Sequence, residues 1–155
     1  MSDLIIRDIH PSDAGEVLTL QRAAFVSEAL IYGSVEMPPF TQTLDEVAHE
    51  LAENLGCVAL LGHRMVGAAR ARVDDGLLLI GRISVAPDVQ GEGVGSRLLD
   101  ALEERGRAEG ATQAELFTGS LSEANLRLYE RQGYQETQRV PGDGSDEVYL
   151  RKTLV

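Results

Sequence analysis

The first residues of the chain show a hydrophobic pattern that predicts one strand followed by a helix. Leu4 to Asp8 is a short strand candidate. Asp13, with Glu16 three residues later, indicates a helix start, because an aspartate can cap the first helical turn. The helix that follows should carry four apolar residues on one face: Val17, Leu20, Ala24 and Phe25.

A second helix is expected from about Leu44 to Asn54, ending before Gly56. The segment between the helices, Tyr32 to Thr43, should be irregular because it contains a glycine and two prolines.

Three strand-like segments then follow one another with short turns between them: Cys57 to Leu61, Val66 to Val73, and Leu77 to Val85. Asp74-Asp75-Gly76 is a strong hairpin signal. A parallel pair would need a crossover of a dozen or more residues. The middle of the chain is therefore predicted to be an antiparallel meander.

The second half alternates helices and strands. Two helices are predicted, from Val94 to about Glu109 and from Ser122 to Gln132, the second ending at Gly133. Three strand candidates are Gln113 to Phe117, Tyr134 to Val140 and Glu147 to Leu154. The order βααβββαβαββ predicts an α/β fold with a mixed, largely antiparallel central sheet flanked by helices. We expect one domain over residues 1–155, because no linker divides the chain.

Charge and composition narrow the classes of partner. The formal net charge is −11, which argues against nucleic acid as a partner. Such a surface weakly favours a cationic substrate, although solubility alone is the better explanation of the charge. No apolar run approaches the ~20 residues of a membrane span. No signal peptide is visible, so we expect a cytoplasmic protein that uses no membrane.

Neither cysteine nor histidine chemistry is predicted. Cys57 is the only cysteine and stands in an apolar run, which favours a buried and inert thiol. The three histidines are isolated and show no metal spacing, so no metal is expected: His10, His49 and His63.

The segment Gln90-Gly91-Glu92-Gly93-Val94-Gly95-Ser96 lies between a strand and a helix and is the strongest chemical signal. Its glycines let the backbone approach a ligand, and the unpaired N–H groups of a helix start attract a pyrophosphate. Glycines needed for packing alone would look the same. A Walker loop is excluded, because the chain has no Gly-Lys pair. A dinucleotide fingerprint would need a third glycine at Ser96 and a repeating βαβ pattern.

Two motifs in the right order resemble the GCN5-related N-acetyltransferase (GNAT) family. Gln90 to Gly95, after the strand that ends in Ile83-Ser84-Val85-Ala86-Pro87, looks like the family's acyl-CoA motif. Ser122 to Tyr134 looks like its second conserved region. The resemblance covers nearly the whole chain, least so residues 26–56. It implies the acyl-CoA N-acyltransferase fold, and acetyl-CoA (coenzyme A) as cosubstrate.

The family's roles can be carried over residue by residue. The strand segment Ile83, Ser84 and Val85 should contact the pantetheine arm and thioester. The backbone from Gly91 through Glu92, Gly93, Val94 and Gly95 to Ser96 should bind the pyrophosphate, with Gln90 at its rim. Arg97 either adds a phosphate contact or is a solvated helix residue.

On the last helix, the resemblance implies that Asn125 bonds to the pantetheine amides. It also implies that Tyr129 lies beside the thioester sulfur and acts as the catalytic general acid. The alternative for Tyr129 is a packing aromatic. The general base is not identified, because the strand before the loop, Leu77 to Val85, carries no glutamate that could take this role. Glu36 and Glu115 are weak candidates, because solvated surface carboxylates are more common.

The resulting hypothesis is acetyl transfer from acetyl-CoA to a primary amine by direct attack. A small-molecule or amino-acid-like acceptor is expected, seated against Ser27 to Thr43. A protein lysine or N-terminal acetyltransferase, and a non-catalytic acetyl-CoA sensor, remain alternatives. Relatives of this family often dimerise, so a homodimer is also an expectation.

Overall fold

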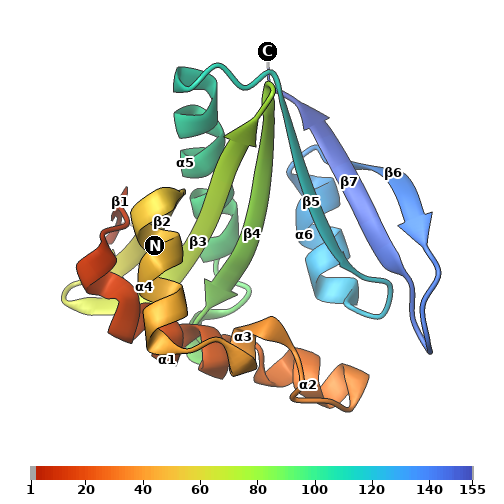
Figure 1. The fold of residues 1–155 in the computed structure, drawn as a ribbon, viewed down its shortest axis with the longest axis horizontal. Coiled ribbons are helices and arrows are strands. Elements are labelled where there is room, and N and C mark those ends of the chain that lie inside the picture. Colours follow the sequence, from red (N-terminus) through yellow and green to blue (C-terminus); the bar gives the residue numbers. More distant parts are fainter. Residues whose placement is uncertain (1–2, 155) are drawn as a thin grey trace.

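Seven strands form one sheet within residues 3–154, the part of the chain that the computed structural model describes (Figure 1). Their order across the sheet is β1-β2-β3-β4-β5-β7-β6. The bounds are β1 Leu4–Asp8, β2 Leu55–Leu61, β3 Arg64–Asp74, β4 Leu77–Val85, β5 Gln113–Gly119, β6 Gln135–Val140 and β7 Glu147–Thr153. β2 to β4 form the predicted antiparallel meander, β1 pairs antiparallel with β2 at its edge, and β4–β5 is the one parallel pair in the described sheet.

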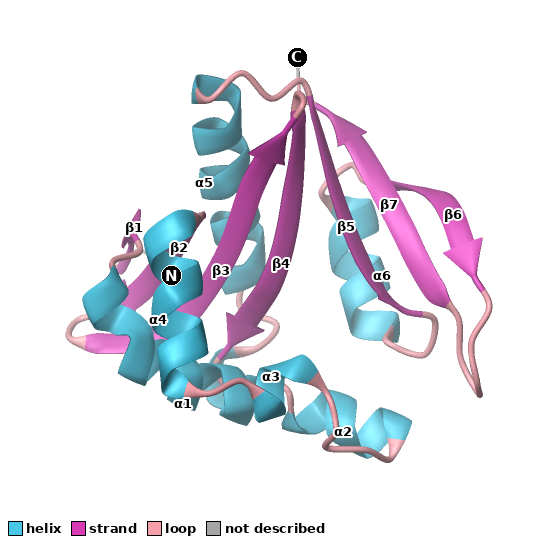
Figure 2. Cartoon of the chain, viewed as in Figure 1, coloured by secondary structure: helices cyan, strands magenta, loops and turns pink. Residues whose placement is uncertain are grey.

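Helices cover the sheet on two faces (Figures 1 and 2). α1 and α4 lie in front of the meander in these views, and α5 and α6 lie behind. The bounds are α1 Ala14–Ala24, α2 Val26–Tyr32, α3 Pro38–Thr41, α4 Leu44–Glu53, α5 Val94–Ala108 and α6 Glu123–Arg131, with 3-10 turns at Pro11–Asp13 and Pro87–Val89. The mixed α/β architecture with a largely antiparallel sheet is the predicted one.

The main core lies between the meander and α5. Leu98, Leu99 and Leu102 of α5 have no exposed surface, because the helix places one leucine face on β2 to β4. The approach is close: a Cβ at Gly67 of β3 would lie 2.7 Å from Val94 and 3.0 Å from Leu98. Each fully buried leucine contributes about 1.5–3 kcal/mol. This packing holds the N-terminal end of α5 in a fixed place against the sheet.

β4 and β5 pair at one end only and then diverge. Their pairing covers Leu77–Leu79 against Gln113–Glu115, and Figure 1 shows the two strands separating below that point. On the other side of β4, the register with β3 shifts between Ala68 and Arg70. Arg82 lies in this bulge with a φ of +53°. The second half of β4 therefore has one free edge, which faces the gap in the sheet.

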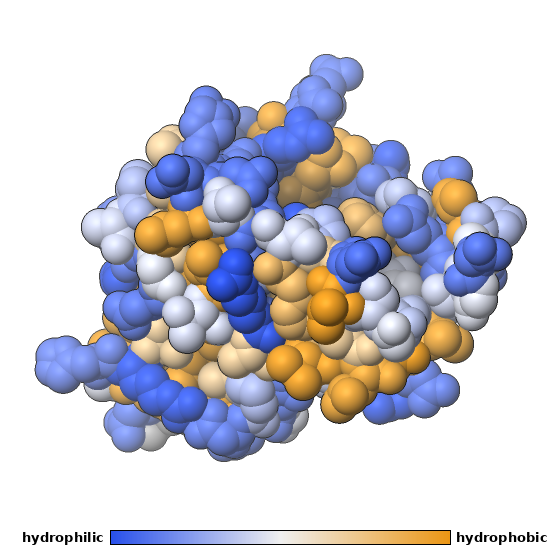
Figure 3. All heavy atoms as spheres, turned by 60° about the horizontal axis from the view of Figure 1, so that its bottom comes forward, coloured by the Kyte–Doolittle hydropathy of each residue, from blue (hydrophilic) through white to orange (hydrophobic). Residues whose placement is uncertain are grey.

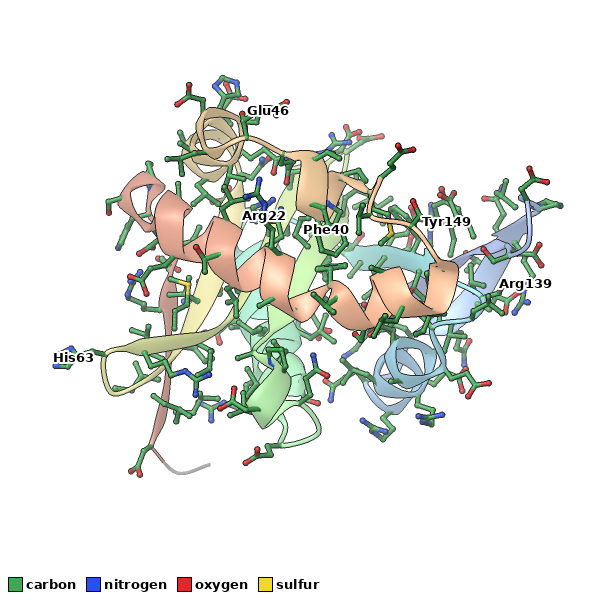
Figure 4. All side chains as sticks on the ribbon, turned by 90° about the horizontal axis from the view of Figure 1, so that it is seen from below. Arg22, Phe40, Glu46, His63, Arg139 and Tyr149 are labelled. Carbon is green, nitrogen blue, oxygen red and sulfur yellow. The ribbon has the colours of Figure 1, made fainter. Side chains whose placement is uncertain are left out.

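The region before α4 differs from the prediction in two ways. The first helix breaks at Phe25 into α1 and α2, which continue nearly end to end below the sheet (Figure 4). The segment from Tyr32 to Thr43 was predicted to be irregular, but its prolines begin the short helix α3. Proline fits the first turn of a helix, where its missing N–H is not needed.

Asp13 does not cap α1 as predicted. Its carboxylate instead accepts hydrogen bonds from both terminal nitrogens of Arg7 at 2.9 Å and from the His10 amide at 2.8 Å. The Arg7 guanidinium is the main cause that holds the pKa of this carboxyl below its usual range. Asp13 thus closes the 3-10 turn that precedes α1 and ties that turn to β1.

Three other expectations from the sequence concern the cysteine, membrane spans and metal sites. Cys57 is fully buried in β2, and burial raises the pKa of its thiol to about 11. Within residues 3–154, no helix has the length and apolarity to cross a bilayer, and no cluster of three or more histidine, cysteine or acidic side chains is placed to hold a metal.

Candidate active site

A cavity of about 620 Å³ opens where β4 and β5 separate, between the N-terminal end of α5, the α1–α2 junction and α6. Ten of the twelve residues that the sequence predicted for the cofactor line it: Ile83, Val85, Gln90, Gly91, Gly93, Val94, Gly95, Ser96, Asn125 and Tyr129. Ser84 and Glu92 are not part of the lining. The two sequence motifs, far apart along the chain, thus meet at one place.

The loop before α5 presents backbone amides to this cavity. Gly93 precedes the first helical residue with a φ of +89°, a conformation that costs a residue with a side chain about 1–2 kcal/mol. No side chain caps the helix, and its first backbone bond runs from the Arg97 amide to the Gly93 carbonyl. The amides before Arg97 are therefore free to bind an anion, with the helix dipole adding positive potential.

The free edge of β4 forms a second wall. Ile83 and Val85 line the cavity, and the Val85 carbonyl accepts a hydrogen bond of 3.2 Å from the Gln90 side chain. Ser84, between them, is 2% exposed, pairs with Ala68 of β3, and donates its hydroxyl to the Arg82 carbonyl. Because successive residues of a strand point their backbone groups to opposite sides, Ile83 and Val85 direct theirs toward the gap.

Tyr129 reaches the cavity from α6. It is 6% exposed, its ring lies edge-on to Tyr134, and its hydroxyl bonds to no other described residue. Burial, and secondarily the charge of Glu28, raise the pKa of this hydroxyl. Since the shift is upward from a value near 10, the hydroxyl keeps its proton at neutral pH and is able to donate it.

Glu28 on α2 also lines the cavity, and the sequence analysis did not find it. Its carboxylate accepts hydrogen bonds from the Ser122 hydroxyl at 2.5 Å and from the Asn125 amide at 3.4 Å. Tyr32, four residues further on the same helix, shares a hydrogen bond of 2.7 Å with Ser122. The spacing of Glu28 and Tyr32 on one helical face was the only local signal of this pair.

The structure places the other proposed side chains away from the cavity. Arg97 turns toward β1 and contacts the Leu4 carbonyl at 3.4 Å, whereas Arg127 and Arg131 of α6 line the cavity instead. Glu115 forms an ion pair of 2.8 Å with Arg151, and Glu36 is exposed and lies outside the lining.

His63 extends from the β2–β3 turn at the far end of the molecule (Figure 4). It is exposed and lies outside the lining of the cavity.

These features fit the cosubstrate acetyl-CoA. Free amides at a helix N-terminus, glycines with positive φ and nearby arginines suit a pyrophosphate. The free edge of β4 offers backbone donors and acceptors to the amide-rich pantetheine arm. The cavity also lies within the size range of small-molecule sites, about 300–1,000 Å³.

Comparisons with known proteins agree with this geometry. The model of the acetyltransferase (GNAT) family matches residues 17–134. The chain is 26% identical over 134 residues to an IAA acetyltransferase of Azospirillum brasilense, covering 86% of this chain and 72% of that protein.

Two solved structures share the fold over nearly the full length. PaiA N-acetyltransferase from Thermoplasma acidophilum, solved with coenzyme A, has a TM-score of 0.81 at 15% identity and covers 97% of this chain and 98% of its own. The ribosomal-protein-S18-alanine N-acetyltransferase of Escherichia coli has a TM-score of 0.79 at 19% identity, with 97% and 94% covered. The chain belongs to the GNAT acetyltransferase family and is an acyltransferase that uses acetyl-CoA.

Proposed function

We propose that this chain transfers the acetyl group of acetyl-CoA to the nitrogen of a primary amine on a small acceptor molecule. One observation carries the proposal: a single cavity is lined by the α5 amides, the free edge of β4, the Tyr129 hydroxyl and the Glu28 carboxylate. Direct acyl transfer needs an anion site, carbonyl polarisation, a proton donor and a proton acceptor. Cys57 is buried outside this cavity, which agrees with a route that needs no acyl-enzyme.

The donor side would be held by backbone. In our proposal the amides from Gly91 to Ser96 bind the pyrophosphate, and Asn125 and the edge of β4 bind the pantetheine arm. Asn125 now makes two long bonds, of 3.4 Å to Glu28 and 3.3 Å to Thr118, which an incoming amide would replace. When bound, the thioester supplies an acetyl carbon that is open to attack. Holding this carbon beside the amine supplies much of the rate.

The proton transfers are assigned to two side chains. The amine nitrogen bonds to the acetyl carbon while the carbon–sulfur bond breaks, and the N–H groups of Ile83 and Val85 stabilise the charge on the carbonyl oxygen. The Tyr129 hydroxyl donates its proton to the departing sulfur. Glu28 accepts the proton that the nitrogen loses. One proton leaves nitrogen and one arrives at sulfur, so the reaction balances.

The position of α2 favours a small acceptor. This helix crosses below the opening between β4 and β5, and Glu28 and Tyr32 tie it to Ser122 on the other side. An acceptor must then enter past α2, which leaves little room for the surface of a folded protein. Because one structural neighbour is named as an S18-alanine N-acetyltransferase, peptides still belong in the test.

The test is the release of free coenzyme A thiol across a panel of small amines and peptides. Tyr129→Phe should lower kcat about 10²–10³-fold, as expected for loss of a general acid. The Kd for acetyl-CoA should stay within about twofold, because the ring still packs against Tyr134. Tyr149→Phe is the matched control, since its hydroxyl bonds to the exposed Glu147 at 3.0 Å outside the cavity.

Three other results would count against the proposal. An unchanged kcat in Tyr129→Phe would remove the general-acid role. Efficient turnover of peptides alone would point to a protein acceptor. Tight acetyl-CoA binding without turnover of any acceptor would indicate a sensor.

A further inference from the structure

A largely buried polar cluster lies where β3 and β4 pack against α1, α4 and the end of α3. It consists of five side chains, which we call the arginine cluster: Gln21, Gln42, Glu50, Arg70 and Arg82. Gln21, Gln42 and Arg70 are 0%, 9% and 5% exposed. Arg22 of α1 donates to the Gln42 carbonyl at 3.1 Å, and Figure 4 places it between α1 and α3 near Phe40.

The two arginines of the cluster differ in their partners. Arg70 forms an ion pair of 2.8 Å with Glu50 and donates to Gln21 at 3.1 Å and to Gln42 at 3.2 Å. The second Glu50 oxygen accepts from Gln42 at 2.8 Å, so each oxygen of Glu50 already has a partner in the cluster. Arg82 has one contact, from its Nε to the Gln42 oxygen at 3.3 Å, and its terminal nitrogens bond to no other described residue.

The cluster thus holds two guanidinium groups against one carboxylate, in a chain whose net charge is −11. Burial lowers the pKa of both arginines, the charge of Glu50 opposes this shift in both, and repulsion by Arg82 lowers the pKa of Arg70 further. A guanidinium has five donors, and a half-buried one with four of them unused is costly unless an anion or water satisfies them. Arg82 is therefore suited to a planar, two-oxygen anion.

The backbone at Arg82 places this group next to the reaction. Arg82 has a φ of +53°, a strained conformation for a residue with a side chain, in the bulge of β4. The bulge turns its side chain toward α1 and α3, while the next residue, Ile83, lines the cavity. Because Arg82 and Ile83 are adjacent, with Cα atoms about 3.8 Å apart, the cluster begins one residue from the free edge of β4, although Arg82 itself is not among the residues that line the cavity.

We propose that Arg82 binds the carboxylate of the acceptor, so that the acceptor is an amino acid or a closely related amino-carboxylate. The inference rests on the function proposed above and names its acceptor class. Arg82 is then a specificity-determining residue, with Arg70 and Gln42 as the residues that position it.

The first experiment compares three acceptors that share one side chain: an apolar amino acid, its amide, and its decarboxylated amine. The wild-type enzyme should use the amino acid with the highest kcat/KM. In Arg82→Gln, KM for the amino acid should rise about 10- to 100-fold, as expected for loss of a charge-assisted pair. KM for the decarboxylated amine should change less than about twofold. Arg72→Gln is the control, because Arg72 is an exposed arginine on the neighbouring strand β3.

A second readout does not depend on turnover. Calorimetric titration of the amino acid into the enzyme saturated with coenzyme A should show binding that Arg82→Gln loses and Arg82→Lys partly keeps. The Kd of acetyl-CoA should be the same in all variants. If no amine is acetylated but this binding is seen and lost as stated, the proposed function fails while the carboxylate site stands.

Three outcomes would overturn the carboxylate site. One is a wild-type preference for the decarboxylated amine. Another is an equal loss for all three acceptors in Arg82→Gln, which would indicate a structural role. The third is an amino-acid affinity that Arg82→Gln leaves unchanged. Should Arg82→Gln fail to fold, the wild-type preference and Arg82→Lys decide the question alone.

Discussion

The strands on the two sides of the cavity are packed differently. β1 to β4 lie between α1 and α4 on one face and α5 on the other, and most residues of β3 are buried. In Figure 1, α6 lies behind β5 to β7, and no helix of residues 3–154 lies in front of these strands. Every residue of β6 is exposed, and Phe117, stacked on Tyr149, is 53% exposed. The first region has a two-sided hydrophobic core, and the second has a one-sided core.

Polar contacts add to the hydrophobic core in joining the second region to the first. Beyond the short β4–β5 pairing, Glu103 of α5 accepts from the Tyr134 hydroxyl and from Lys152 of β7, both at 2.8 Å. On the opposite side of the gap, Glu28 and Tyr32 of α2 contact Ser122. Leu30 of α2 is 80% exposed, and Figure 3 shows hydrophobic side chains gathered on the lower face of the molecule. The cavity therefore lies between two regions that polar contacts also join on both of its sides.

The largest effect is expected from breaking the link at Glu103, which is 2% exposed. Glu103→Ala should lower the free energy of unfolding by about 3–5 kcal/mol, because it leaves Lys152 and the Tyr134 hydroxyl without their buried partner. Urea denaturation measures this. Glu104→Ala, on the exposed side of the same helix, should change stability by less than about 0.5 kcal/mol. Equal effects of the two substitutions would mean that Glu103 does not join the two regions.

The next effect concerns Glu28, the link that also lines the cavity. Glu28→Gln keeps the size of the side chain but cannot accept a proton, so kcat at neutral pH should fall about 10²-fold. Activity should recover as the pH rises, because more of the acceptor amine is then neutral in solution. The measurement is kcat against pH. Glu36→Gln serves as control, since Glu36 is exposed outside the cavity. A loss of the same size at every pH would argue for a positioning role.

The smallest effect is expected at Tyr32. Tyr32→Phe removes the hydrogen bond to Ser122 and should cost about 0.5–1.5 kcal/mol of stability. The acceptor KM should rise a few-fold while the Kd of acetyl-CoA stays constant, since α2 borders the acceptor side. Thermal melting and steady-state kinetics measure both, with Tyr149→Phe again as the control. If Tyr32→Phe instead weakens acetyl-CoA binding and leaves the acceptor KM unchanged, α2 borders the donor side and not the acceptor side.

Most residues predicted for the donor side line the cavity, and the signals that led to them are local. The positive φ of Gly93 and the uncapped start of α5 follow from a few consecutive residues. Asn125 and Tyr129 share a face of α6 because they are four residues apart. Strand and helix positions followed from hydrophobic periodicity in the same way, and mostly differ by one or two residues from those observed.

The sequence by itself thus determined the element order, the antiparallel meander and the two motif segments that meet at the cavity. Only the tertiary structure decided which charged groups meet. Glu28 contacts Ser122, which is 94 residues away in the sequence, and Arg70 contacts Gln21, which is 49 residues away. Glu115, a candidate base in the sequence, instead forms an ion pair with Arg151, 36 residues away. The break at Phe25 and the cluster around Arg82 belong to the same class. A periodic pattern records which face of an element is buried, whereas a polar contact depends on the register between elements, which is set when the whole core packs.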